Sequence, residues 1–114
     1  MKIVKDNIAL SELQEMALKM HGEFVKAVVD VEKEIMAVEA EFHADLMEAL
    51  IQTEHCEPKN VWGINIFPDR VGDDFVMFDS MINLKPGLGN RTRGITDAKV
   101  REKIIILINK FVVK

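Results

Sequence analysis

The residues best suited to chemistry gather within residues 65–94, and the largest group is a glycine-rich basic loop, KPGLGNRTRG, at residues 85–94. Its three glycines let backbone amides approach a ligand, and Arg91 and Arg93 can each bind an oxyanion through two parallel hydrogen bonds. A helix expected directly after the loop adds partial positive charge. The loop is therefore a candidate site for a phosphorylated or carboxylated small molecule. The alternative is a structural loop whose arginines pair with a carboxylate such as Asp79.

Five further polar residues accompany these arginines, on the loop or on segments that otherwise favour strands: Asn65, Asp79, Ser80, Asn83 and Asn90. Interior polar groups cost free energy unless they are hydrogen-bonded. These residues therefore form a structural network or line an anion site together with the arginines. No histidine stands in a recognisable pairing with Ser80, so no nucleophilic triad is predicted. The loop also differs from a phosphate-binding P-loop, because Arg91 occupies the lysine position.

Metal and cofactor binding are not expected. On a helix, His43 has one carboxylate neighbour four residues away, Glu39, so its segment reads as a solvated helix face. His55 and Cys56 form a lone adjacent pair, whereas structural zinc needs four ligands at suitable spacing. His21 precedes Gly22 and is expected at the end of a helix.

Bulk composition describes one globular domain over residues 1–114, with 48% hydrophobic and 30% charged residues. Fifteen Lys and Arg against nineteen Asp and Glu disfavour nucleic acid as a partner. A single cysteine excludes an intramolecular disulfide, and the N-terminal residues do not form a signal peptide. The longest apolar run has five residues, far below the roughly 20 that cross a bilayer. A cytoplasmic protein without membrane partners is expected.

The first half of the chain predicts a short edge strand at residues 3–4, then a helix. Ser11 is the expected N-cap, the apolar face recurs every three to four residues, and Gly22 ends the helix. Over residues 25–38 the apolar residues follow the period of two that is typical of strands, and their spacing predicts a β-hairpin, although the turn lacks Asn-Gly or Asp-Gly. One helix over residues 25–51 is the rival interpretation. Helical spacing returns over residues 39–52.

The second half predicts two strands and a last helix. Residues 61–67 place Trp62, Ile64 and Ile66 on one face, and a long strand follows over residues 75–84. Thr96 is the expected cap of the last helix. Its core face is Val100, Ile104, Leu107, Ile108 and Phe111. The order α-β-β-α-β-β-α predicts a two-layer α+β domain with a four-stranded, mainly antiparallel sheet.

The long strand also predicts self-association. Phe75, Met77 and Met81 would share the strand face opposite the core, and helices on one side only would leave this apolar face exposed. A homodimer is therefore expected, and either a protein that stays monomeric at high micromolar concentration or helices on both faces of the sheet would contradict this prediction.

Several phrases of the sequence resemble an uncharacterised prokaryotic family, catalogued as a domain of unknown function: VDVEKEIMAV, WGIN, FDSMINLKP and GNRTRGI followed by VREKI. The likeness extends over the whole chain, yet it implies no activity, substrate or catalytic residue. It implies glycines after the first hairpin, where this chain has Glu39 and Ala40, which leaves the start of the second helix open.

No complete catalytic constellation is present in these patterns. The sequence therefore predicts a small binding or interaction protein that self-associates. The alternative is a small enzyme or sensor that binds an anionic metabolite at residues 85–94.

Overall fold

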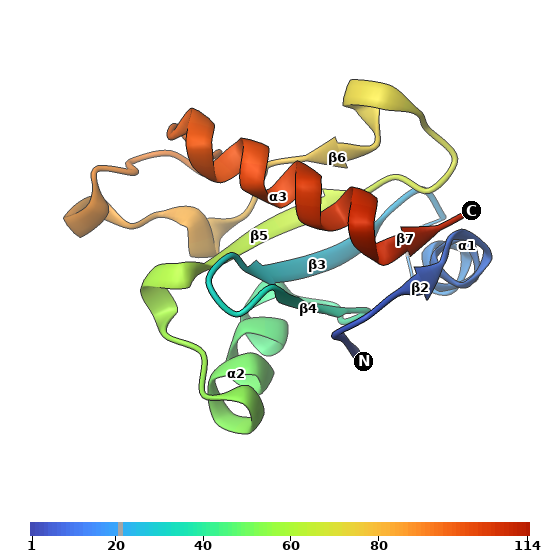
Figure 1. The fold of residues 1–114 in the computed structure, drawn as a ribbon, viewed down its shortest axis with the longest axis horizontal. Coiled ribbons are helices and arrows are strands. Elements are labelled where there is room, and N and C mark those ends of the chain that lie inside the picture. Colours follow the sequence, from blue (N-terminus) through green and yellow to red (C-terminus); the bar gives the residue numbers. More distant parts are fainter. Residues whose placement is uncertain (21) are drawn as a thin grey trace.

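The computed structural model describes residues 1–20 and 22–114, so the prediction for His21 lies outside the described residues. Three α-helices stand in this part of the chain: α1 (Leu10–Met20), α2 (His43–Glu54) and α3 (Ala98–Phe111). The described strands are β1 (Lys2–Val4), β2 (Ile8–Ala9), β3 (Val25–Asp30), β4 (Ile35–Val38), β5 (Val61–Ile66), β6 (Val76–Met77) and β7 (Val112–Val113). Figure 1 shows their arrangement.

The main sheet has the strand order β1-β4-β3-β5-β6, and all its pairs are antiparallel. The predicted α+β class and the mainly antiparallel pairing are confirmed. The sheet has five strands rather than four, because β1 pairs with β4 at one edge, where Ile3 lies opposite Ala37. A second, two-stranded sheet joins β2 to β7 in parallel, with Ile8 opposite Val112.

Helices cover both faces of the main sheet, so the predicted two-layer arrangement is wrong. One face carries Trp62, Ile64 and Ile66, as predicted, and packs against apolar residues of α1 and α3. The other face carries Val28 and Val61 and packs against α2. Figure 1 shows α2 and α3 on opposite sides of the sheet. The sequence of β4 explains this, since all four of its residues are apolar and successive side chains point to opposite faces of the sheet.

The hairpin of β3 and β4 is confirmed, and the rival single helix is wrong. The turn needs no Asn-Gly pair because Asp30 closes it. Asp30 Oδ1 accepts hydrogen bonds from the backbone amides of Glu32 and Lys33, both at 2.8 Å. Glu34 then takes a left-handed conformation with φ of 58°. Asp30 itself is fully buried.

The long strand predicted over residues 75–84 is wrong. Within this segment only β6 pairs with β5, and the chain then bends into a short 3₁₀ helix at Met81–Asn83. The Asn83 side chain, rather than a strand backbone, hydrogen-bonds to Gly63 of β5. The shared strand face predicted for Phe75, Met77 and Met81 therefore does not form. Phe75 packs against the larger core, while Met77 and Met81 are exposed.

Helix boundaries differ from the prediction by one to four residues. Leu10 begins α1, so Ser11 lies inside the helix rather than at its N-cap. Gly22 follows α1 with φ of 84°, in agreement with the predicted stop. His43 begins α2, four residues later than expected. Asp97 rather than Thr96 caps α3, since its side chain accepts from the Lys99 amide at 2.8 Å.

Candidate functional site

Asn83 is fully buried, and its side-chain amide behaves like a neighbouring strand. Its Oδ1 accepts from the Gly63 amide at 2.8 Å, while its Nδ2 donates to the Gly63 carbonyl at 2.9 Å. The same Nδ2 donates to the Arg93 carbonyl at 2.9 Å. The side chain thus joins β5 to the basic loop, and its hydrogen-bonding capacity is taken up inside the protein.

The Asn90 side chain likewise joins the basic loop to the residues just before α3. Its Nδ2 donates to three backbone carbonyls, those of Asn83 at 2.7 Å, Gly94 at 2.8 Å and Thr92 at 3.2 Å. Its Oδ1 accepts from the Thr96 amide at 2.8 Å and from the Thr96 hydroxyl at 3.0 Å. Asn90 is buried, so five polar groups meet on one side chain.

Ser80 lies buried against Gly63, and the fit depends on the absence of a side chain there. A Cβ atom at Gly63 would lie 2.5 Å from Ser80 Cβ. Ser80 Oγ accepts from the Ile82 amide at 3.3 Å, and its own amide donates to the Arg93 carbonyl at 2.9 Å. Ser80 therefore serves packing and turn formation.

The two loop arginines have different surroundings. Arg93 Nε contacts Asp79 Oδ1 at 2.8 Å, and both side chains are about half exposed. Arg91 is exposed and makes no ion pair with the described residues. Arg93 thus pairs with a carboxylate, as expected if the loop is structural, whereas Arg91 is exposed to solvent. Lys85 anchors the other end of the loop by donating to the Pro58 carbonyl at 2.9 Å and the Ile82 carbonyl at 3.1 Å.

Asn65 lies on the sheet face that α2 covers, beside the first residue of that helix. Its Oδ1 is buried and makes no hydrogen bond of ordinary distance and angle with the described residues, although the Asn65 side chain lies close enough to His43 to affect its pKa. His43 Nε2 lies 2.8 Å from the Ile64 carbonyl, and because a carbonyl only accepts, this nitrogen carries the proton. His43 is half-buried, so the predicted solvated helix face is wrong at this position.

Burial lowers the pKa of His43 below its ordinary value, and the charge of Lys26 adds to this effect. The bond to Ile64, the Asn65 side chain and the Asp79 charge oppose the change but do not cancel it. The imidazole is consequently neutral near neutral pH and ties the start of α2 to β5. Sequence reasoning assigned no role to His43, because its partner is a backbone carbonyl on a distant strand.

The only cysteine of the sequence, Cys56, is buried next to the hairpin turn. Burial raises the pKa of Cys56 to about 12, and Asp30 adds to the increase. A protonated, buried thiol is a poor nucleophile. Within residues 1–20 and 22–114, no group of three or more His, Cys, Asp or Glu side chains is placed to hold a metal ion.

A large groove runs between α3 and the segment at residues 68–78; we call it the α3 groove. Its volume is about 1050 Å³. Apolar side chains from both walls and from α1 line it, and charged side chains stand among them. The apolar lining includes Leu10, Val71, Phe75, Phe78, Ile105 and Ile106, and the charged lining consists of Asp69, Arg70, Asp73, Arg101, Glu102 and Lys114.

Sequence reasoning did not identify this groove, although one signal for it was present. Ile105 lies off the core face of α3, as its spacing predicts, and Ile106 joins it on the exposed side. The opposite wall is formed by residues 68–78, and its first part, residues 68–74, has no apolar periodicity. Only the tertiary fold brings the two walls together.

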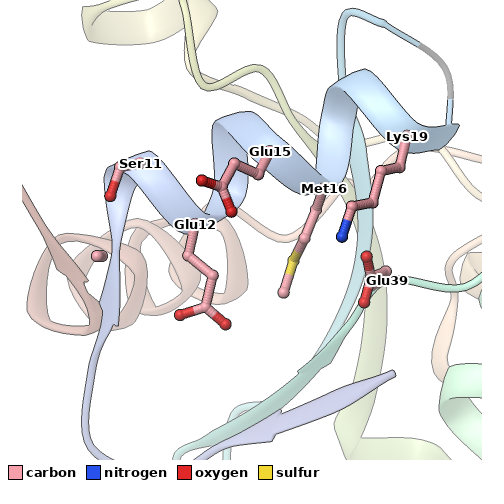
Figure 2. A pocket seen from close by; sticks show the side chains of 7 residues that line it. Ser11, Glu12, Glu15, Met16, Lys19 and Glu39 are labelled. Atoms are coloured by element: carbon pink, nitrogen blue, oxygen red, sulfur yellow. The ribbon is translucent and has the colours of Figure 1, made fainter.

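A second, smaller cleft lies on α1 and is acidic. It has a volume of about 470 Å³, and Glu12, Glu15 and Glu39 line it. Figure 2 shows Lys19 directed toward Glu39, with Met16 extending from the same helix. Lys2 contacts Glu12 at 2.9 Å, and the N-terminal amine lies 3.6 Å from Glu39. These cations offset the carboxylates of the cleft.

The fold and these sites define a small α+β domain with an apolar groove and a hydrogen-bonded basic loop. Residues 2–111 match the model of the family described as "Protein of unknown function (DUF5674)". The chain belongs to this family, as its resemblance indicated. No curated protein and no solved structure shows significant similarity to it. Among the described residues, no helix has the length and apolar character needed to cross a membrane.

Proposed function

We propose that this chain is a small binding and interaction protein whose binding surface is the α3 groove. The observation that carries the proposal is the groove itself, about 1050 Å³ in volume and lined by apolar side chains from three segments. Concave, mainly apolar surfaces with a few polar groups are the usual sites of ligand and partner binding. Ile105, Ile106 and Val71 are exposed along it, so binding would remove apolar area from water.

Binding rather than catalysis is supported by how the buried polar residues are used. Asn83 and Asn90 direct their amide groups at backbone atoms, and Ser80 packs on Gly63. The Cys56 thiol is protonated, with a pKa of about 12. Most of the groups that sequence patterns offered for chemistry thus have partners within the fold, whereas the exposed side chains of Val71, Ile105 and Ile106 remain available in the groove.

The test uses anilinonaphthalenesulfonate, a dye that fluoresces on apolar surfaces, in dilute protein solution. The parent should enhance dye fluorescence, and Ile105→Glu should weaken dye binding about tenfold, because it places a charge among the apolar groove residues. The control is Leu18→Glu on α1, at a position that is exposed and outside the groove. Equal dye binding by the parent and both variants would contradict the proposal.

A second candidate function is binding of an anionic metabolite at residues 85–94. The observation that favours it is Arg91, an exposed guanidinium without an ion pair among the described residues. A specific anion would stabilise the folded state in proportion to its binding. We expect Arg91→Ala to remove any gain in melting temperature that phosphate gives over chloride at matched ionic strength.

Arg93→Ala is the matched variant for this candidate, because Arg93 is already paired with Asp79. If phosphate and chloride give the parent the same melting temperature, the loop is a structural clamp and the candidate function fails.

A further inference from the structure

We infer that the occupant of the α3 groove is a second copy of this chain, so that the protein forms a two-fold dimer through α3 and residues 68–74. This inference rests on the proposed role of the groove and names its partner. The sheet-face argument for a homodimer fails because helices cover both faces of the sheet. The groove supplies a different surface with its own evidence.

The first evidence is that projecting apolar side chains and the hollow that could receive them lie on the same surface. Ile106 on α3 is 65% exposed and Val71 on the facing wall is 77% exposed. Both line the groove, whose apolar residues include Phe75 and Phe78. A two-fold interface requires a surface that complements itself, since each patch meets the same patch of the partner. The α3 groove meets this requirement, because the exposed side chains of Ile106 and Val71 lie on the same surface as the hollow that would receive them.

The second evidence is the charge of the lining. Three acidic and three basic side chains line the groove, and none of the six makes an ion pair within the described residues. Arg101 donates to the Ile95 carbonyl, Asp69 accepts from Gln14, and Arg70 lies over the Phe67 ring. The groove is therefore neutral overall, with opposite charges still available for pairing.

This charge balance separates a second copy from strongly charged partners. Nucleic acid and anionic membranes require a cationic surface, and a strongly basic or acidic peptide requires one dominant sign. The groove offers neither. A copy of the same surface brings equal numbers of acidic and basic groups, so the two-fold rotation can place unlike charges together across the contact.

The experiment is sedimentation equilibrium of the full chain from low to high micromolar concentration. The parent should show a monomer–dimer equilibrium. Ile106→Glu and Val71→Glu should each weaken dimerisation about tenfold or more, because every dimer would bury two of the introduced charges in its apolar centre. Leu18→Glu, at a position on α1 that is 75% exposed, should leave the equilibrium unchanged. Circular dichroism of each variant checks that the fold is retained.

Two results would overturn the inference: a parent that stays monomeric throughout, or a dimer that neither groove variant weakens. The dye measurement then separates this failure from that of the proposed function. A monomeric parent whose groove binds the dye, and loses it in Ile105→Glu, keeps the groove as a binding surface for another partner. A monomer without groove-dependent dye binding contradicts both proposals.

Discussion

At the scale of single residues, Asn83 and Asn90 explain how the basic loop is joined to β5 and to the start of α3. A side-chain amide has the same donor and acceptor groups as a peptide unit, so Asn83 can pair with both backbone groups of Gly63. The sequence correctly marked these residues as polar groups that need partners. It could not distinguish a network from a ligand site, because the partners are backbone atoms whose positions depend on the completed fold.

Gly63→Ala should destabilise the protein by about 1–3 kcal/mol, because the new methyl group would overlap Ser80. The added Cβ would lie 2.5 Å from Ser80 Cβ, which belongs to a buried side chain with little room to move. Urea denaturation measures the change. Gly87→Ala is the control, since a Cβ atom there meets nothing within 4 Å. Similar stability of the two variants would show that the Ser80 contact is not rigid.

Glu39→Gly should stabilise the protein by about 0.5–1 kcal/mol. Glu39 has φ of 71°, a left-handed conformation that costs residues with a Cβ about 1–2 kcal/mol. Glycine avoids this cost, but part of the gain is offset because glycine gives the unfolded chain more conformational freedom. The family resemblance implies glycine here, which agrees with this geometry. Thermal unfolding of Glu39→Gly and of Glu41→Gly, which lacks a positive φ, tests the explanation. Equal melting temperatures would contradict it.

At the scale of elements, periodicity predicted the elements that bury one continuous face. The core face of α3 is an example, because Ile104, Leu107, Ile108 and Phe111 are all buried. Periodicity failed where side chains replace backbone pairing. Residues 75–84 alternate like a strand, yet the Asn83 amide satisfies Gly63 and the chain bends after β6. The sequence pattern could not reveal which atoms would satisfy Gly63.

The bond from His43 to Ile64 makes the attachment of α2 to β5 sensitive to pH. Burial lowers the pKa of folded His43, so the unfolded chain binds its proton more readily. The stabilisation from neutral His43 is therefore complete above the ordinary pKa of 6.5 and decreases as the pH falls below it. We expect the unfolding free energy of the parent to drop more than that of His43→Gln between about pH 7.5 and 5.5.

Denaturant titrations at both pH values measure this difference, and His55→Asn is the control. His55 has φ of 58° at the end of α2, a conformation that asparagine tolerates. If His43→Gln has the same pH dependence as the parent, proton uptake by His43 is not linked to folding.

At the scale of the whole molecule, the class of the fold was predictable, but its layers were not. Apolar residues occupy both faces of β4, and this pattern fits either a sheet covered on both sides or one that is exposed to a partner. The choice depends on which face of the sheet α2 covers, and the short connection between β4 and α2 does not determine that face. The same limit applies to the α3 groove, whose walls are far apart in sequence.

Removal of residues 112–114 should destabilise the protein by about 1–3 kcal/mol. The deletion removes β7, leaves β2 without its pairing partner and opens the buried Ile8 to water. Thermal unfolding measures the loss, and deletion of Lys114 alone is the control because it lies outside β7. An equal effect of both deletions would show that the parallel pair contributes little.

The pairing of β2 with β7 also determines an order of events during folding. Ile8 and Val112 are about 100 residues apart in the chain, so closing this contact costs about 2–3 kcal/mol more entropy than closing the short β3–β4 hairpin. Contacts that close small loops form before contacts between residues that are far apart in the chain. The hairpin should therefore form early, and the contact between the two ends of the fold should form last and open first.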